Sequence, residues 1–270
     1  MGSGVLLRAQ RLPLEPAHDT GQSVTAAFEG WFKNPDGTFS LLFGYYNRNR
    51  TQELDIPVGP NNRMEPGSPD QGQPTHFMPG RQWGLFTVTV PADFGSKKLI
   101  WTLVSNGQTL AIPGSLNPLW EVFAFREPTT GNTPPVIRFA EGTSVQGPRP
   151  ASTSLSAMVG KPLTLSVSVS DDSVMPLIGT TGMDRPKTPP VTVTWSKFRG
   201  PGAVTFADAK PEVQLTNGDG KGVSGTATTT ATFGEPGDYV LYVVANDWSG
   251  VGGHGYQCCW TNAQVKVSVK

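Results

Sequence analysis

Residues 226–250 read TATTTATFGEPGDYVLYVVANDWSG, which is two alternating runs separated by a Gly/Pro turn at 234–237. This pattern is typical of a β-hairpin, and strand-forming residues fill the second run. Every residue of 239–244 (YVLYVV) is apolar or aromatic, so both faces of the predicted strand are apolar. A strand with two apolar faces must be covered on both sides, and we expect it inside a β-sandwich.

The composition indicates an all-β protein with no nucleic-acid partner. The chain has 270 residues, which is enough for two domains of ordinary size. Lys+Arg 21 balance Asp+Glu 21, whereas nucleic-acid binding normally requires a basic face. No apolar run is long enough to span a membrane. Residues 5–7 form too short an apolar run for a signal-peptide core.

Turn and strand signals predict two immunoglobulin-like β-sandwich domains in tandem. Residues 1–20 are predicted as an extended lead-in and 21–126 as the first sandwich. Residues 127–135 (EPTTGNTPP) have the composition of a semi-rigid Pro-rich linker, and 136–270 form the second sandwich. Short strands with turns every 8–12 residues suit this fold. We expect 120–126 to be the last strand of the first domain.

Residues 59–81 form the most conspicuous candidate for a binding surface. This segment holds five prolines and four glycines, so we expect no regular structure, and long loops of this kind often carry function. Polar groups alternate there with apolar anchors, which suits a protein partner. The alternative is that the segment packs back over its own sheet. The candidate protein-binding residues are Asn61, Asn62, Arg63, His76, Phe77 and Met78.

The acidic residues Asp171, Asp172 and Asp247 follow predicted strands and form a candidate calcium site. Oxygen ligands from neighbouring loops of a sandwich can converge on a hard cation. The competing interpretation, which is the commoner one, is that these side chains stabilise turns through bonds to the backbone. No other cofactor is predicted.

The two cysteines, Cys258 and Cys259, are adjacent in the sequence. They could form a vicinal disulfide or remain two free thiols. Neighbouring side chains on a strand point to opposite faces, and this favours free thiols. His254 lies close by, but one His and two Cys lack the fourth ligand of a structural zinc site.

The chain carries no recognisable catalytic motif. It has three histidines, His18, His76 and His254, and none lies in a nucleophile-elbow or zinc-protease pattern. We therefore expect a protein that is not an enzyme.

Seven tryptophans provide material for carbohydrate binding, because exposed aromatic rings stack on sugars. Buried rings are the commoner case. Trp31, Trp101 and Trp195 lie within predicted strands and are expected in the core. The remaining candidates, near loops or strand ends, are Trp83, Trp120, Trp248 and Trp260.

Two resemblances support the domain prediction. The second half carries GKPLTL, VTWSK, GPGAVTF, ATF, PGDY and AND in this order, at 160–165, 193–197, 200–206, 231–233, 236–239 and 245–247. Over 134–270 it resembles a PKD-type (polycystic-kidney-disease-type) immunoglobulin-like repeat of exported bacterial proteins. The first half carries NPDGTF, FGYYNRN, LDIPVGP and GQPTHF, at 34–39, 43–49, 54–60 and 72–77. It is similar to the N-terminal half of exported bacterial proteins without an assigned activity.

These resemblances imply export and a two-domain layout, and they transfer no catalytic residue. We therefore expect a non-catalytic, extracytoplasmic protein (periplasm or cell surface) that binds or scaffolds another protein. One concrete version is an accessory subunit docked on the periplasmic face of a membrane complex, without a transmembrane segment of its own. The alternative is a carbohydrate-binding module of an exported protein.

Overall fold

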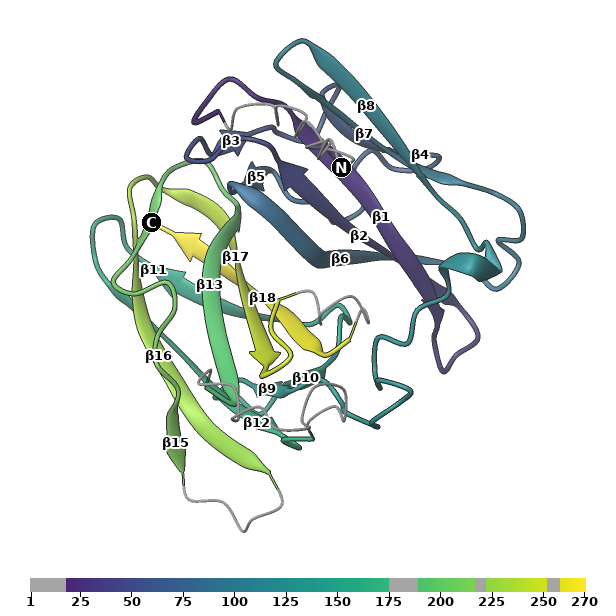
Figure 1. Cartoon of the computed structure of the whole chain (residues 1–270). Helices are drawn as coiled ribbons and strands as arrows, with labels where there is room; N and C mark the ends of the chain where they lie inside the picture. The colour runs from purple at the N-terminus through teal and green to yellow at the C-terminus, as the bar shows by residue number, and fades with distance from the viewer. Residues whose placement is uncertain (1–17, 175–188, 217–221, 252–257) are drawn as a thin grey trace, which may run out of the picture.

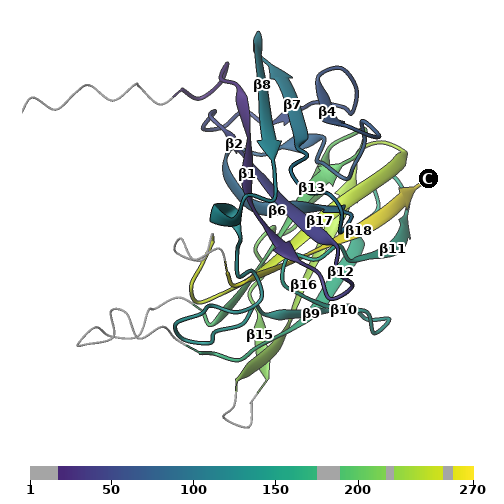
Figure 2. The same cartoon turned by 90° about the vertical axis from the view of Figure 1, so that its right-hand side faces the viewer.

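The computed structural model describes residues 18–174, 189–216, 222–251 and 258–270, and they form an all-β protein of two packed sandwiches (Figure 1, Figure 2). Apart from one 3-10 turn, η1 (Pro118–Trp120), every regular element of these residues is a strand. The predicted fold class, two immunoglobulin-like β-sandwiches in tandem, is confirmed. Among the described residues, no helix has the length and hydrophobicity that crossing a bilayer requires.

The C-terminal sandwich has the strand order of an immunoglobulin-like domain. One sheet runs in the order β10 (Ser144–Gln146), β9 (Val136–Arg138), β12 (Leu163–Asp171), β16 (Val223–Phe233) and β14 (Val204–Phe206), and β15 (Gln214–Thr216) also pairs with β16. The other runs in the order β11 (Ser152–Ala157), β18 (Trp260–Val269), β17 (Gly237–Asp247) and β13 (Val191–Arg199). Only β11 and β18 pair in parallel; the other named pairs in this half are antiparallel.

Two aromatic residues mark this domain as immunoglobulin-like. Trp195 on β13 is buried in the centre of the sandwich. Tyr239, at the start of β17, donates its hydroxyl to the carbonyl oxygen of Glu235 at 2.9 Å and accepts from the amide of Gly202 at 3.1 Å. A tyrosine that bonds back to the preceding corner is characteristic of immunoglobulin-like sandwiches.

The N-terminal sandwich is smaller and has an aromatic core. One sheet contains β1 (Val24–Lys33), β2 (Phe39–Asn47) and β6 (Gly80–Val90), and the facing sheet contains β4 (Asn62–Glu65), β7 (Leu99–Ser105) and β8 (Gln108–Gly114). A two-stranded ladder joins β3 (Leu54–Asp55) to β5 (His76–Phe77). Trp101 lies at the centre, with the rings of Phe43 and Phe86 edge-on at 6.1 and 5.0 Å.

Strand β17 is covered on both faces, as its sequence requires. Tyr239, Leu241 and Val243 point into the C-terminal core. Tyr242 points the other way and belongs, with Phe198 of β13, to the apolar cluster of the N-terminal half. Their rings stack with centroids 5.8 Å apart. The second apolar face of β17 is therefore buried against the other sandwich (Figure 1).

Two local predictions were wrong. Residues 120–126 do not form a strand, because Pro118 begins a 3-10 turn that the Asn117 side chain caps by accepting from the amide of Leu119 at 3.0 Å. Residues 59–81 do contain regular structure, namely β4 and β5. Pairing of β4 with β7 overrides the unfavourable composition of that segment.

The Tyr239 corner yields a stability prediction. Tyr239→Phe should lower the free energy of unfolding by about 1–3 kcal/mol, because the buried Gly202 amide loses its acceptor. Urea denaturation measures this change. Tyr242→Phe is the matched control, because the Tyr242 hydroxyl donates no hydrogen bond to another described residue. Equal losses in the two variants would contradict the corner's role.

Candidate functional site

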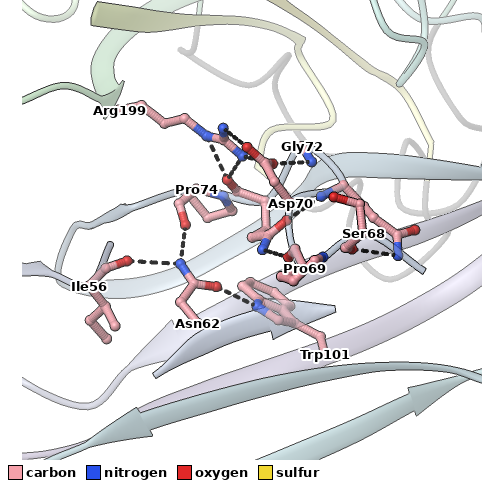
Figure 3. A network of polar contacts seen from close by, with 11 residues as sticks. Ile56, Asn62, Ser68, Pro69, Asp70, Gly72, Pro74, Trp101 and Arg199 are labelled. Atoms are coloured by element: carbon pink, nitrogen blue, oxygen red, sulfur yellow. Dashed lines mark hydrogen bonds and ion pairs between the residues drawn. The ribbon is translucent and has the colours of Figure 1, made fainter. Parts of the chain in front are cut away.

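The segment 59–81 is fastened to its own domain by Asn62, whose side chain is fully buried (Figure 3). The Asn62 amide donates to the carbonyl oxygens of Ile56 at 2.9 Å and Pro74 at 2.7 Å. Its side-chain oxygen accepts from the indole of Trp101 at 3.0 Å. One asparagine thus ties Pro74 of the segment, and Ile56 just before it, to the central tryptophan of the N-terminal core.

The six candidate residues of this segment lie in different environments. Asn61 is exposed, and Arg63 and Met78 are half-buried. Asn62, His76 and Phe77 are buried in the fold and contact the protein's own residues, as the packed-back alternative describes. Binding of a partner by this segment stays a prediction. Only its exposed and half-buried residues, Asn61, Arg63 and Met78, are accessible to a partner.

The same segment binds the C-terminal sandwich through a polar clasp. Arg199 of β13 holds the Asp70 carboxylate with two nitrogens at 2.9 and 2.8 Å, and also donates to the Gln73 carbonyl oxygen (Figure 3). These bonds from Arg199 lower the pKa of Asp70. The backbone amide of Thr75 donates to the carbonyl oxygen of Phe198 at 3.1 Å. The segment therefore joins the two sandwiches.

His76 is part of a second ionic link between the halves. Its Nδ1 lies 3.0 Å from Asp55 Oδ1 and its Nε2 lies 3.3 Å from Glu53 Oε2. Lys197 of β13, also buried, reaches the same Asp55 oxygen at 3.1 Å. Both nitrogens of the imidazole thus face carboxylates, and this arrangement holds strands together instead of activating a nucleophile.

A third contact between the halves, which the sequence did not reveal, centres on Gly84. Its carbonyl oxygen accepts from Trp260 Nε1 at 3.3 Å and from Asn262 Nδ2 at 2.7 Å. A Cβ on Gly84 would lie 2.0 Å from the Trp260 ring, and its φ of +50° also favours glycine. The Gly84 amide donates to buried Glu29, whose pKa is raised by burial against the opposing effect of Arg81.

The tryptophans divide largely as predicted. Trp31, Trp101 and Trp195 are buried, and Trp260 is buried as well, so that one carbohydrate candidate is unavailable. Trp83 and Trp120 are 40% and 49% exposed. The guanidinium of Arg81 lies 4.1 Å from the Trp83 ring centroid and occupies one of its faces.

The three candidate calcium ligands lie at one end of the C-terminal sandwich. Burial, reinforced by the charges of Asp247 and Asp172, raises the pKa of Asp171 to about 7. Asp247, whose pKa burial also raises, accepts from the Asn132 amide at 2.6 Å. Asp172 accepts from the hydroxyl of Thr133 at 2.7 Å. Each carboxylate also accepts from a nearby backbone amide, that of Ser173, Val174 or Ser249, as the competing interpretation predicts.

Unpartnered oxygens remain at this end. The Oδ1 atoms of Asp171 and Asn132 and the hydroxyl of Ser173 are buried and have no hydrogen-bond partner among the described residues. Within the same part of the chain, no group of three or more His, Cys, Asp or Glu side chains is arranged to hold a metal ion. A cation here would need the amide and hydroxyl oxygens as well as the carboxylates.

The adjacent cysteines form a disulfide, so the expectation of free thiols was wrong. The Cys258–Cys259 S–S distance is 1.93 Å, and both residues are buried. The sulfur of Cys259 lies 3.5 Å from the carbonyl oxygen of Asn132 in the linker. The argument from opposed side chains fails because it assumes a regular strand, which begins only at Trp260. His18 is exposed, and His254 lies outside the described residues.

Comparison with known proteins finds only weak similarity to solved structures. No protein-family model and no curated protein matches the chain. Similar solved structures include domains 4 and 5 of the S-layer protein SbsC, at 13% identity and a TM-score of 0.23, covering 92% of this chain and 98% of that one. The D00-D0 domain of Intimin has 11% identity and a TM-score of 0.24, covering 91% and 99%.

A third similar structure is the endo-fucoidan hydrolase MfFcnA4 from glycoside hydrolase family 107, at 12% identity and a TM-score of 0.24, covering 94% of this chain and 27% of that one. Scores this low support no inference about function. The class of the protein therefore rests on its own strand order: it is an all-β protein of two immunoglobulin-like sandwiches.

The raised pKa of Asp171 yields a prediction about pH. Because its folded pKa exceeds the unfolded value, the ionised side chain destabilises the fold, and stability is lost as the pH rises from about 4 to about 7. Asp171→Asn should therefore be neutral near pH 4 and stabilise by roughly 2–4 kcal/mol at pH 8. Urea denaturation across this range measures the difference, with exposed Asp93→Asn as the control. A gain independent of pH would contradict the assignment.

Proposed function

We propose that this is a non-catalytic, extracytoplasmic protein that binds another protein through an apolar patch formed by Leu119, Trp120 and Phe123. The observation that carries the proposal is the exposure of these side chains, which is 90%, 49% and 61%. The three residues lie within five positions of the chain, and exposed large apolar residues close together are typical of interaction sites. The patch lies on the connection that leaves the N-terminal sandwich.

A groove beside the patch extends the surface that a partner could contact. It has a volume of about 520 Å³ and runs between β1 and β8. Phe28, Ile112, Pro113 and Trp120 supply most of its apolar lining. An apolar centre bordered by polar groups such as Lys98 and Asn117 is the usual composition of a protein interface.

The concrete version of this function is an accessory subunit docked on the periplasmic face of a membrane complex. Export is supported by the resemblance to exported bacterial proteins and, independently, by the Cys258–Cys259 disulfide, since disulfides persist in oxidising compartments. The PKD-type relationship of the C-terminal half belongs to the same proposal and is supported by the tyrosine corner and strand order.

The alternative function is carbohydrate binding by an exported module. The observation in its favour is the exposure of Trp83 and Trp120, whose rings could stack on a sugar. Quenching of tryptophan fluorescence by a glycan distinguishes this alternative from protein binding.

We also propose that the acidic end of the C-terminal sandwich binds calcium. The support is the combination of two buried carboxylates with raised pKa, Asp171 and Asp247, and the unpartnered oxygens of Asn132 and Ser173. A hard divalent cation would relieve the repulsion between the carboxylates and satisfy these oxygens.

The protein-binding proposal predicts the outcome of a pull-down from native membranes. Leu119→Ser/Phe123→Ser should abolish retention of one stoichiometric partner, because the apolar contact is lost while the exposed positions leave folding intact. Leu215→Ser/Val251→Ser, which changes exposed apolar residues elsewhere, should retain it. Retention by the patch variant, or no partner for the wild type, would refute the proposal. Deletion of 59–81 is unsuitable as a test because it removes β4 and β5.

The calcium proposal predicts a shift in thermal stability. Calcium at 1 mM should raise the unfolding temperature of the wild type by several degrees through preferential binding to the folded state. Asp171→Asn and Asn132→Ala should lose this response. Magnesium should raise the unfolding temperature less than calcium, because it requires shorter ligand distances and near-octahedral geometry. Equal shifts for wild type and variants would show that calcium acts elsewhere.

A further inference from the structure

A pocket of about 380 Å³ lies between the two sandwiches, and none of its lining residues belongs to the apolar patch. One wall comes from β6 at 85–87, and the opposite wall from β18 and the start of β11. Tyr242 of β17 and the 71–72 turn of the interdomain segment complete the lining. Its volume is within the range of small-ligand sites.

The outer face of β18 makes this pocket polar. Along that strand, Ala263, Val265 and Val267 point into the C-terminal core, so Asn262, Gln264 and Lys266 point outward. The neighbouring strand β17 turns apolar side chains to the same side, and these are covered by the N-terminal sandwich. The polar face of β18 is thus left to line the pocket.

Two cations line the pocket without an opposing charge. Arg149 and Lys266 are both exposed, and neither side chain makes a hydrogen bond or an ion pair with another described residue. The guanidinium of Arg149 lies over the Phe125 ring at 4.3 Å, which fixes its position and leaves its N–H groups free. No Asp or Glu is among the lining residues. The pocket therefore suits an anion.

A neutral donor lies within reach of the same pocket. The hydroxyl of Tyr242 donates no hydrogen bond to another described residue, although the residue is only 5% exposed and the Asn262 side chain interacts with its oxygen. A buried O–H group that donates to nothing is costly, so a ligand that accepts from it would be favoured. Burial raises the pKa of Tyr242 far above its usual value, so the group remains a protonated donor.

Further uncommitted polar groups surround these three. Gln264 is in register with Tyr242 on one side and with Ser152 of β11 on the other, so the three form a row across the sheet. Thr87 lies on the facing strand β6. The side chains of Gln264, Ser152 and Thr87 make no hydrogen bond with another described residue.

We propose that this pocket binds an acidic monosaccharide unit. Its carboxylate or sulfate pairs with Arg149 and Lys266, and its ring hydroxyls bond to Gln264, Ser152 and Tyr242. A sugar fits better than an acidic peptide, because several hydroxyl and amide groups converge on a site of monosaccharide size beside the two cations. The proposal is independent of the protein-binding patch and of the calcium site.

The experiment is a titration of the full chain with sodium D-galacturonate, followed by isothermal calorimetry and by ligand-observed NMR. Arg149→Gln/Lys266→Gln should weaken binding by about tenfold or more, because the anion loses both charge-assisted contacts. Lys161→Gln/Lys210→Gln removes the same charge from exposed positions outside the pocket and should leave binding unchanged. Tyr242→Phe should weaken binding several-fold without loss of thermal stability.

Three further probes separate the sugar from its parts. D-galactose should bind at least tenfold more weakly than galacturonate, and acetate should not compete at equal concentration. Hexaglutamate should not bind the pocket. The proposal would be overturned if galacturonate did not bind, or if galactose or acetate bound as tightly as galacturonate. It would also be overturned if hexaglutamate bound and lost this binding in Arg149→Gln/Lys266→Gln, or if the pocket and control variants had equal effects.

Discussion

The structure depends on the need to cover both faces of β17. One face forms the centre of the C-terminal sandwich, and the other would expose Tyr242 and its valine neighbours to water. Burial of apolar surface contributes about 25 cal/mol per Å², so a strand of this kind strongly favours a second layer. The N-terminal sandwich supplies that layer. The two domains are therefore packed units with a common apolar contact and not separate modules on a spacer.

The polar groups of this interface determine how the two sandwiches fit. Arg199 with Asp70, and Lys197 with Asp55, join the same edge of the C-terminal domain to the 59–81 segment and β3. Such partly buried ion pairs contribute little net stability, because desolvation offsets their attraction. They do raise the free energy of any other arrangement of the two sandwiches in which one of these charges is buried without its partner. The Pro/Gly-rich segment is ordered because it provides these partners and the backbone contact from Thr75.

The candidate sites lie at three different places in the fold. The pocket lies where β18 continues beyond the apolar contact and presents polar residues to β6. The exposed patch of Leu119, Trp120 and Phe123 lies where the chain leaves the N-terminal sandwich. The acidic end lies where the linker returns to the C-terminal sandwich, and there Asn132 contacts both Asp247 and the disulfide.

The sequence by itself determined the all-β class, the two immunoglobulin-like sandwiches, the hairpin of β16 and β17 and the two apolar faces of β17. These follow from alternation of side chains, which is a local property of a strand. Only the tertiary structure decided what covers the second face, where 59–81 packs, and that 120–126 is no strand. The tertiary structure also decided three further features: the burial of Trp260 on Gly84, the disulfide between Cys258 and Cys259, and the row of side chains from Ser152 to Tyr242. Each of them depends on backbone geometry or on contacts between residues far apart in the chain, which no local alternation of side chains encodes.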